Sequence, residues 1–489
     1  MSSLVYIEDF KELFEDVQKA QLFEDQKTMA DAVPLLEIVE INSRYDAEKK
    51  MSKFDLRTFV LQHFKFETLE DSKNLHADLP ILDHIEELWN HLTRFTPQNK
   101  GTLLAVPHSY IVPGGRFVEF FYWDSYFIML GLKESGRLEM MKNIVDNCAY
   151  LISEYGFVPN ATRSYFLSRS QPPYFSLMVE LLVDTAQDEF LYVNYLEALK
   201  KEYDFWMNQE TSKRAVTLND GFILNRYFDA KNEPRPESFL MDYKDAQKSS
   251  NSKFYQNIRA ACESGWDFSS RWFGEDDNFS TIQTLDILPV DLNCLLYHLE
   301  STIAIASKLQ NSAEEEKKFS DLAELRKVAI QKYFWNEEKG FFFDYNFKKN
   351  TQTSSEHISA IYALFVEVAT HEQALKVLEV LQIKFLHEGG LVNTTHQSSQ
   401  QWDYPNAWAP FQWLGFVSAR KFKVNKLAEQ IANNWCSNVN RVYQNTGKLM
   451  EKYNAVDLSL IAGGGEYPNQ DGFGWTNGVF AALQARINN

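Results

Sequence analysis

Residues 141–155 read MKNIVDNCAYLISEY, and their apolar side chains recur at every third or fourth position. This spacing places them on one face of an α-helix, because the helix completes a turn every 3.6 residues. Residues 424–442 show the same periodicity. Comparable segments cover residues 80–94, 118–133, 173–186, 189–208, 290–309, 312–334, 357–370, 371–388, 406–421 and 474–487. The sequence therefore predicts about twelve helices and an all-α protein.

The consecutive pairing of these helices favours an (α/α)₆ barrel, in which an inner ring of helices is wrapped by an outer ring. No repeat of fixed length is found, which disfavours a regular solenoid. Residues 1–75 are more acidic and irregular, and we expect them to form an N-terminal extension packed on the barrel. Residues 76–489 contain no linker rich in Pro, Gly or Ser, so we expect one catalytic barrel domain with long active-site loops. The aromatic segment FFFDYNF at 341–347 suggests a local hairpin between helices.

The charge of the chain excludes some partners. Its 489 residues contain 49 Lys and Arg against 67 Asp and Glu, which gives a formal net charge of -18. This balance argues against nucleic acid, whose phosphates require clustered basic residues, and against an anionic membrane surface. No apolar stretch reaches the ~18 to 20 residues that would span a bilayer. A small-molecule substrate remains as the expected partner, and a monomer is the default expectation.

The cysteines and the N-terminus bear on the cellular compartment. Cys148, Cys262, Cys294 and Cys436 lie far apart and form no CxxC pair, which argues against a disulfide framework or a metal clip. Residues 1–21 are acidic and amphipathic, unlike the basic and apolar regions of a signal peptide. These features predict a cytoplasmic protein in a reducing environment.

Aromatic residues make up 15% of the chain and recur beside carboxylates. Three Trp-Asp pairs lie in long connections between predicted helices: Trp123-Asp124, Trp266-Asp267 and Trp402-Asp403. An indole stacks on the apolar face of a sugar, while a carboxylate accepts hydrogen bonds from its hydroxyls. A single such pair is more often a core Trp beside a capping Asp, and for Asp403 structural support and function are equally open. Three pairs in one chain suggest a sugar site without establishing one.

Sequence motifs for other chemistries are absent. There is no GxGxxG, no GxxxxGK(S/T), no GxSxG and no HExxH. The ten histidines are scattered, and Asp276-Asp277-Asn278 lacks the Gly and the terminal Glu of a calcium loop. We therefore expect acid/base catalysis by carboxylates, with no cofactor and no metal.

Several long motifs resemble those of the trehalase family. Residues 113–127 read PGGRFVEFFYWDSYF and residues 401–410 read QWDYPNAWAP, which resemble the two family signatures. Further motifs follow in the family's order: GFVPNATRSYFLSRSQPPYF at 156–175, RPESF at 235–239, IRAACESGWDFSSRWF at 258–273 and GGGEYPNQDGFGWTNG at 463–478. The segment LFEDVQKAQLFEDQKTMADAVP at 13–34 resembles the family's opening segment. The resemblance thus covers nearly the whole chain.

The resemblance implies hydrolysis of α,α-trehalose to two glucose molecules on an (α/α)₆ barrel, with inversion of the anomeric configuration. It places the general acid at Asp267 in the SGWD motif and the general base at Glu451 in MEKYNA. The implied substrate contacts are Arg116, Trp123, Asp124, Asn160, Arg169, Ser170, Gln171, Arg235, Pro236, Glu237, Gly265 and Glu466. It implies no cofactor and no metal ligand.

Physical expectations accompany the implied acid and base. Asp267 lies in an aromatic segment with Trp266 and Phe268, where burial would raise its pKa and retain a proton. Glu451 must stay ionised to activate water, so we expect it near solvent or near arginines. From the residues alone, Glu466 is the better candidate base because glycines and aromatic residues frame it. The assignment of the base to Glu451 therefore rests on the resemblance.

Aromatic side chains are expected to wall a small closed sugar pocket: Phe117, Trp123, Tyr165, Trp266, Trp402 and Trp475. The chain departs from the family motifs at three places, one of which is Ala161-Thr162, where Gly-Asn is common. Ala407 stands where the second signature usually has Gly, and it would be strained if the backbone there had a positive φ. Asn454 replaces the Asp of an EKYD motif, three residues after the implied base.

Two alternatives remain beside a trehalase. One is a related helical-barrel glycosidase that acts on a maltose-like or kojibiose-like disaccharide. The other is a catalytically silent sensor that binds trehalose, although the intact pair of carboxylates argues against it.

Overall fold

Each of the twelve segments with helical periodicity contains a helix in the computed structural model, which describes residues 4–66, 79–274, 278–460, 462 and 465–487. The apolar face of the opening segment is buried in α7 (Leu138–Tyr155), and Gly156 at φ 86° ends that helix in the left-handed region. Thr370 starts α16 (His371–Val380) with a capping box, in which its hydroxyl accepts from the Gln373 backbone. The expected all-α class is confirmed.

Six mostly buried helices form an inner ring: α6 (Tyr122–Glu134), α8 (Phe175–Ala186), α13 (Val290–Leu309), α15 (Tyr362–Phe365), α17 (Ala409–Lys421) and α19 (Gly474–Ile487). Each contacts the next, and α19 contacts α6, so the ring is closed. Such a helix needs apolar residues all round, and α6 is buried without interruption from Tyr122 to Leu132.

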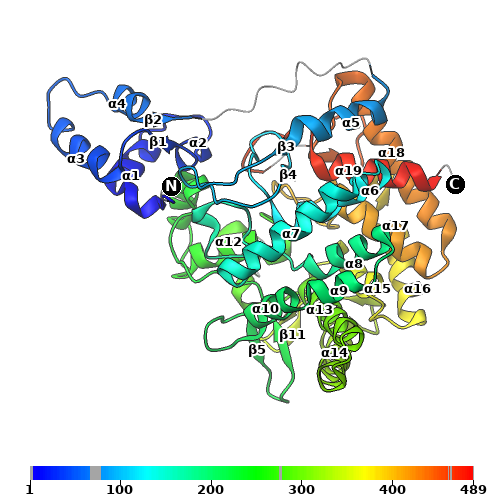
Figure 1. Cartoon of the computed structure of the whole chain (residues 1–489). Coiled ribbons are helices and arrows are strands. Elements are labelled where there is room, and N and C mark those ends of the chain that lie inside the picture. Colours follow the sequence, from blue (N-terminus) through cyan, green and yellow to red (C-terminus); the bar gives the residue numbers. More distant parts are fainter. Residues whose placement is uncertain (1–3, 67–78, 275–277, 461, 463–464, 488–489) are drawn as a thin grey trace.

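Six further helices wrap the inner ring: α5 (Ile81–Leu92), α7, α10 (Leu196–Met207), α14 (Ala313–Tyr333), α16 and α18 (Asn425–Thr446). They alternate with the inner helices along the chain. α7 packs on α6 and α8, α10 and α14 pack on α13, and α18 packs on α17 and α19 (Figure 1). The expected (α/α)₆ barrel is therefore confirmed.

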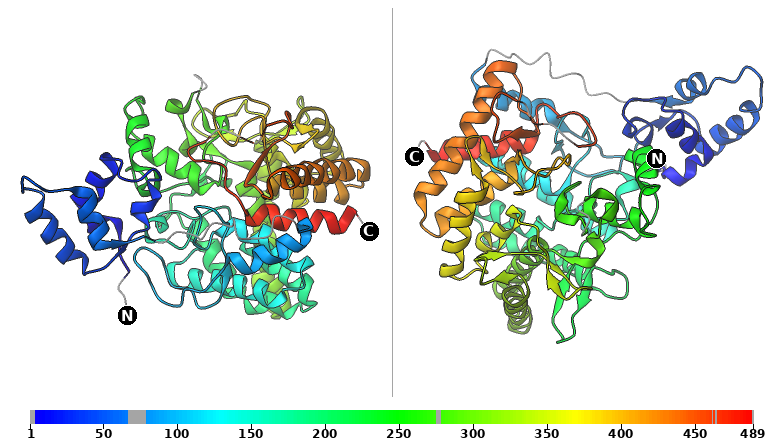
Figure 2. Two further views of the ribbon diagram at one scale, coloured as in Figure 1. Left: turned by 90° about the horizontal axis from the view of Figure 1, so that it is seen from above. Right: turned by 180° about the vertical axis from the view of Figure 1, so that it is seen from behind.

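The N-terminal residues form a lobe at one side of the barrel (Figures 1 and 2). Its helices are α1 (Glu12–Lys19), α2 (Lys27–Ala30), α3 (Ile38–Glu48) and α4 (Leu56–His63). They enclose a separate apolar cluster, which continues onto Phe121, Ala161, Tyr165 and Phe166 of the barrel. The expected domain boundary between residues 75 and 76 lies outside the described residues.

Short elements fill the connections between the barrel helices. The remaining helices are α9 (Phe190–Asn194), α11 (Phe239–Ala246) and α12 (Phe254–Glu263), and 3₁₀ turns cover Ile7–Phe10, Ser164–Phe166, Pro236–Ser238, Ser270–Trp272, Phe279–Thr281, Thr284–Asp286 and Ile358–Ile361. A π-helical turn, Leu381–Phe385, extends α16. No helix among the described residues is both long and apolar enough to cross a bilayer.

The strands in the described residues form small antiparallel sheets of two or three strands. They are β1 (Val33–Pro34), β2 (Phe64–Lys65), β3 (Thr93–Arg94), β4 (Tyr110–Ile111), β5 (Ala215–Thr217), β6 (Ile223–Asn225), β7 (Ile287–Leu288), β8 (Trp335–Asn336), β9 (Phe341–Phe342), β10 (Tyr345–Asn346), β11 (Thr351–Gln352), β12 (Leu386–His387), β13 (Gly390–Leu391), β14 (Asn406–Trp408) and β15 (Lys452–Asn454). The segment 341–347 is not a single hairpin: β9 pairs with β8, whereas β10 pairs with β11 and β7.

Candidate active site

A pocket with about 710 Å³ of space not occupied by protein atoms lies where the chain enters the inner helices. Its walls come from segments that precede or begin α6, α8, α13, α17 and α19, together with α2 of the N-terminal lobe. Connecting segments are free of the packing demands of the ring, so they can carry polar side chains toward a common centre.

Twelve of the fourteen residues implied by the resemblance line this pocket: Arg116, Trp123, Asp124, Asn160, Arg169, Gln171, Arg235, Glu237, Gly265, Asp267, Glu451 and Glu466. Ser170 and Pro236 do not line it. The Ser170 backbone N–H donates to Glu263 at 2.8 Å, and its hydroxyl donates to the Val158 carbonyl at 2.7 Å. The Pro236 carbonyl accepts from the Gln18 amide at 3.3 Å. Both residues therefore fix the segments that carry their neighbours.

Asp267 lies in an environment that favours a protonated carboxyl. Burial raises its pKa from 3.8 to about 7, the Glu466 carboxylate adds to this shift, and the charge of Arg235 opposes it. The pKa of Asp124 is raised well above 3.8 by burial, and the charges of Glu451 and Asp267 raise it further. Burial therefore favours the protonated form of both carboxyls, and a protonated carboxyl can donate a hydrogen bond.

Glu451 does not lie in the environment expected for it. It is 1% exposed, and its nearest cation is the adjacent Lys452 rather than an arginine. One carboxylate oxygen accepts from the Tyr467 hydroxyl at 2.9 Å, and the other lies 3.4 Å from the Lys452 Nζ. The backbone explains the burial, because the Glu451 carbonyl accepts from the Trp475 indole at 2.9 Å. A buried lysine and a phenol therefore replace the expected solvent or arginines.

The three arginines of the pocket are engaged by carboxylates. They donate as follows: Arg116 to Asp25 at 2.8 and 2.7 Å, Arg169 to Glu237 at 2.7 Å, and Arg235 to Asp242 at 2.6 Å and to Glu466 at 2.7 Å. Glu466, the alternative base, thus accepts from Arg235 and also from the Ser238 hydroxyl at 3.3 Å.

Three buried polar atoms of the pocket have no hydrogen-bond partner among the described residues: Arg169 Nη1, Glu237 Oε2 and Trp402 Nε1. Burial raises the pKa of Glu237, but the charges of Arg169 and Arg235 outweigh it and leave the pKa below 4.5. A charged donor and a charged acceptor thus lie side by side with unused capacity. Buried groups of this kind are costly unless a ligand satisfies them, and vicinal hydroxyls are suitable ligands.

The aromatic wall is only partly as expected. Four of its six proposed members line the pocket: Phe117, Trp123, Trp402 and Trp475. Tyr165 instead belongs to the N-terminal cluster, where its hydroxyl donates to Asp31 at 2.7 Å. Trp266 supports the wall from behind by stacking on Trp402, with ring centroids 5.4 Å apart.

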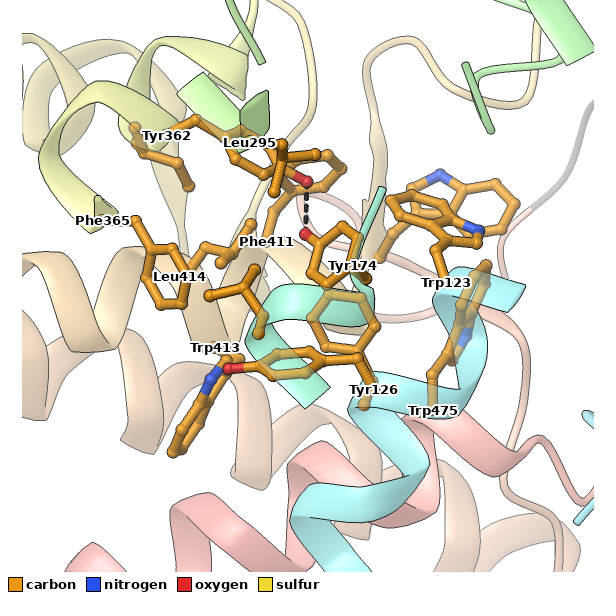
Figure 3. Packing of buried hydrophobic residues seen from close by; sticks show 14 of the residues in the cluster. Trp123, Tyr126, Tyr174, Leu295, Tyr362, Phe365, Phe411, Trp413, Leu414 and Trp475 are labelled. Atoms are coloured by element: carbon orange, nitrogen blue, oxygen red, sulfur yellow. Dashed lines mark hydrogen bonds between the residues drawn. The ribbon is translucent and has the colours of Figure 1, made fainter. Parts of the chain in front are cut away.

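An aromatic layer continues from this wall into the interior of the barrel (Figure 3). Trp123 and Trp475 lie on one side of it, and Tyr174 follows, with its hydroxyl 2.5 Å from that of Tyr362. Rings with few rotatable bonds give a wall that holds its shape without a ligand.

Asp403 has a structural role. It is fully buried, and its carboxylate accepts from the Ser269 hydroxyl at 2.6 Å, the Ser270 backbone at 2.9 Å and the Ser398 hydroxyl at 2.5 Å. These bonds tie the second signature to the residues that follow Asp267.

The departures from the family motifs at Ala407 and Asn454 are accommodated. Ala407 lies in β14 opposite Tyr453 of β15 and is not among the residues with positive φ, so its methyl group causes no strain. The Asn454 side-chain oxygen accepts from the backbones of Val456 and Asp457, both at 2.9 Å, and thereby caps the turn after β15. Of the glycines before Glu466, Gly463 and Gly464 lie outside the described residues.

The residue-level prediction missed several residues that contact the pocket. They are Lys27, Pro113, Phe121, Phe166, Ser238, Cys262, Trp408, Tyr467 and Phe473. Lys27 comes from α2 and forms ion pairs with Asp31 at 2.5 Å and Glu119 at 3.0 Å. Its only signal in the sequence is the N-terminal segment that resembles the family's opening motif.

Comparison with known proteins agrees with these observations. The model of the trehalase family matches residues 16–488. The periplasmic trehalase of Salmonella schwarzengrund (strain CVM19633) is 42% identical over 479 residues, which span 96% of this chain and 84% of that protein. The neutral trehalase Nth1 of Saccharomyces cerevisiae has a TM-score of 0.67 at 27% identity, over 84% of this chain and 81% of the other.

A more distant structural neighbour supports the fold alone. The GH63 mannosylglycerate hydrolase of Thermus thermophilus has a TM-score of 0.55 at 13% identity, over 83% of this chain and 100% of that chain.

The prediction of a cytoplasmic protein is wrong by these comparisons, because relatives at 42% identity from Salmonella schwarzengrund and Salmonella paratyphi B are named periplasmic trehalases. The cysteine argument failed for a physical reason. All four cysteines are free and buried, and burial protects a thiol from oxidants. Their lack of disulfide spacing therefore carries no information about the compartment.

Proposed function

The chain belongs to the trehalase family of glycoside hydrolases, and we propose that it hydrolyses α,α-trehalose to two glucose molecules with inversion of the anomeric configuration. One observation carries this proposal: the pocket contains two carboxyl groups with different surroundings. Asp267 has a pKa raised to about 7, whereas Glu451 lies beside the Lys452 ammonium and accepts from a tyrosine hydroxyl. An inverting glycosidase requires one proton donor and one ionised base.

In the proposed reaction, Asp267 donates its proton to the glycosidic oxygen as the bond from that oxygen to the anomeric carbon breaks. A water molecule attacks the same carbon from the opposite face, and Glu451 accepts a proton from that water. The leaving glucose keeps the glycosidic oxygen, which is now a hydroxyl in the α configuration. The other glucose carries the oxygen from water in the β configuration. Asp267 is then ionised and Glu451 protonated, and exchange with solvent restores both.

The remaining polar groups are proposed to hold the sugar hydroxyls. Arg169 Nη1 and Glu237 Oε2 offer an unused donor and an unused acceptor, and Asp124, whose pKa is raised by burial, offers a further donor when it is protonated. The rings of Phe117, Trp123 and Trp475 line the pocket and offer apolar surface to the C–H groups of a sugar. These groups suit a neutral, hydroxyl-rich substrate.

A disaccharide panel tests the substrate. We expect glucose release from trehalose with a kcat/KM at least about 10²-fold above that for maltose or kojibiose, because a site built to bond hydroxyls rejects misplaced ones strongly. A preference for either other sugar supports the related-glycosidase alternative. Trehalose binding in a calorimeter without any glucose release supports the sensor.

The pH dependence follows from the pKa of Asp267. The acid must be protonated to act, so kcat/KM for trehalose is expected to fall above a midpoint near pH 7, by about tenfold per unit. The measurement is initial rates from pH 5 to 9. α-Glucosyl fluoride is the control, because fluoride leaves without protonation and its hydrolysis is expected to lack this alkaline limb. Trehalose hydrolysis that stays constant to pH 9 contradicts the role of Asp267.

The organisation of the chain is also a proposal. We assign residues 1–75 to an N-terminal lobe and residues 76–489 to the barrel, with Asp25 and Lys27 of the lobe helping to complete the pocket. A monomer of 56.9 kDa is proposed, which light scattering during gel filtration would test. The names of the relatives favour the periplasm as its location.

A further inference from the structure

One side chain contacts the segments of both proposed catalytic carboxyls. The Gln401 amide donates to the backbone carbonyl of Asp267 at 2.5 Å, and its oxygen accepts from the Lys452 ammonium at 2.8 Å. Lys452 in turn lies 3.4 Å from the Glu451 carboxylate. A continuous chain of contacts therefore runs from the acid's backbone to the base's side chain.

Lys452 is confined to this position. It is fully buried and lies over the rings of Trp408 and Tyr467, each 5.2 Å from the ammonium. Glu451 is the carboxylate that it contacts among the described residues. An ammonium buried in this way is stable only with a fixed set of partners, so it has little freedom to move.

Gln401 is equally confined. Its side chain is buried, with the residue 1% exposed. Its backbone carbonyl accepts from the Asn406 side-chain amide at 3.0 Å and from the Trp408 indole at 3.1 Å. The β14–β15 ladder sets Trp408 opposite Lys452. Gly465, at φ 90°, lies so close that an added Cβ would meet the Gln401 side-chain oxygen at 2.5 Å. The surrounding backbone thus holds the amide in one orientation.

We propose that Gln401 and Lys452 are positioning residues that together fix the separation of Asp267 and Glu451, an inference that rests on the proposed function. Neither residue is a catalytic residue in this account. An inverting enzyme must leave space for one water between its carboxyls, and a shift of about 1 Å can cost about 10²-fold in rate. A rigid bridge between the two segments meets that requirement.

The test is a double-mutant cycle on trehalose hydrolysis by the full-length chain. Gln401→Met and Lys452→Met are each expected to lower kcat by about 10²-fold while KM changes less than about threefold. Either substitution breaks the same bridge, so the kcat of the double variant is expected to lie within about threefold of that of the less active single variant. Independent effects would instead multiply to about 10⁴-fold and would overturn the proposal.

A matched control separates positioning from loss of packing. Gln412 is another fully buried glutamine, whose side chain bonds the Leu391 backbone at 2.8 and 2.9 Å and the Trp408 carbonyl at 3.2 Å. Among the described residues, it has no hydrogen bond to Asp267, Glu451 or Lys452. Gln412→Met is expected to lower the melting temperature about as much as Gln401→Met, with kcat within about threefold of wild type. A loss of kcat equal to that of Gln401→Met would show that packing alone is responsible.

A second substitution covers the case in which Lys452→Met fails to fold. Gln401→Glu keeps an acceptor for Lys452 but removes the N–H donor to the Asp267 carbonyl, and we expect it to lower kcat about as much as Gln401→Met. A folded Gln401→Glu variant that keeps the wild-type kcat would overturn the proposal of a bridge. Failure of the proposed function is distinct, because the wild-type chain would then release no glucose from trehalose.

Discussion

Asp267→Asn is expected to lower kcat/KM for trehalose by about 10³-fold, within the range of about 10²–10⁴ that general acid catalysis contributes. The amide keeps the shape of the carboxyl but has no proton to give to the leaving glucose. Burial raises the pKa of Asp267 to about 7, so that about half of the carboxyls carry a proton at neutral pH.

The choice of substrate makes this prediction specific. α-Glucosyl fluoride has a leaving group that needs no proton, so its hydrolysis by Asp267→Asn is expected to stay within about tenfold of wild type. An equal melting temperature and circular dichroism spectrum would show that the variant is folded. Near wild-type turnover of trehalose, or an equal loss on both substrates, contradicts Asp267 as the acid.

Glu451→Gln is expected to lower kcat/KM for both substrates by about 10³-fold or more, because each reaction needs a water molecule activated by the base. The glutamine retains an acceptor for the Tyr467 hydroxyl, which contacts the carboxylate at 2.9 Å, so the fold is expected to persist. The measurement is kcat/KM on trehalose and on α-glucosyl fluoride.

Glu466→Gln is the matched comparison for the base, because Glu466 is the alternative that the residues alone favoured. Its carboxylate is held by Arg235 at 2.7 Å, so we expect the substitution mainly to raise KM. If Glu466→Gln lost kcat completely while Glu451→Gln retained it, the base would be Glu466.

The barrel was predictable because its helices bury contiguous apolar surface. The 290–309 and 474–487 segments coincide with α13 and α19, which lie in the inner ring and are apolar on most sides. α12 was not predicted as a helix, because its buried residues include the polar Asn257, Arg259 and Glu263, which interrupt the apolar periodicity.

The residues of the candidate site could be predicted only from sequence motifs. The contacts that hold these residues in place could not be predicted from the sequence. Asp25 and Arg116 lie 91 positions apart, and nothing in the local pattern pairs them. The burial of Glu451 was also missed, because a short polar stretch with an adjacent lysine usually indicates a solvated surface. Here the β14–β15 pairing and the Trp475 indole carry that stretch into the pocket wall.

The central claim is inverting hydrolysis of trehalose by Asp267 and Glu451. Proton NMR spectra recorded within minutes of mixing enzyme and trehalose, before mutarotation, test it most directly. The account predicts equal initial amounts of α-glucose, from the leaving half, and β-glucose, from the half attacked by water. An initial product that is entirely α-glucose would contradict inversion, and the absence of glucose would contradict the proposed activity.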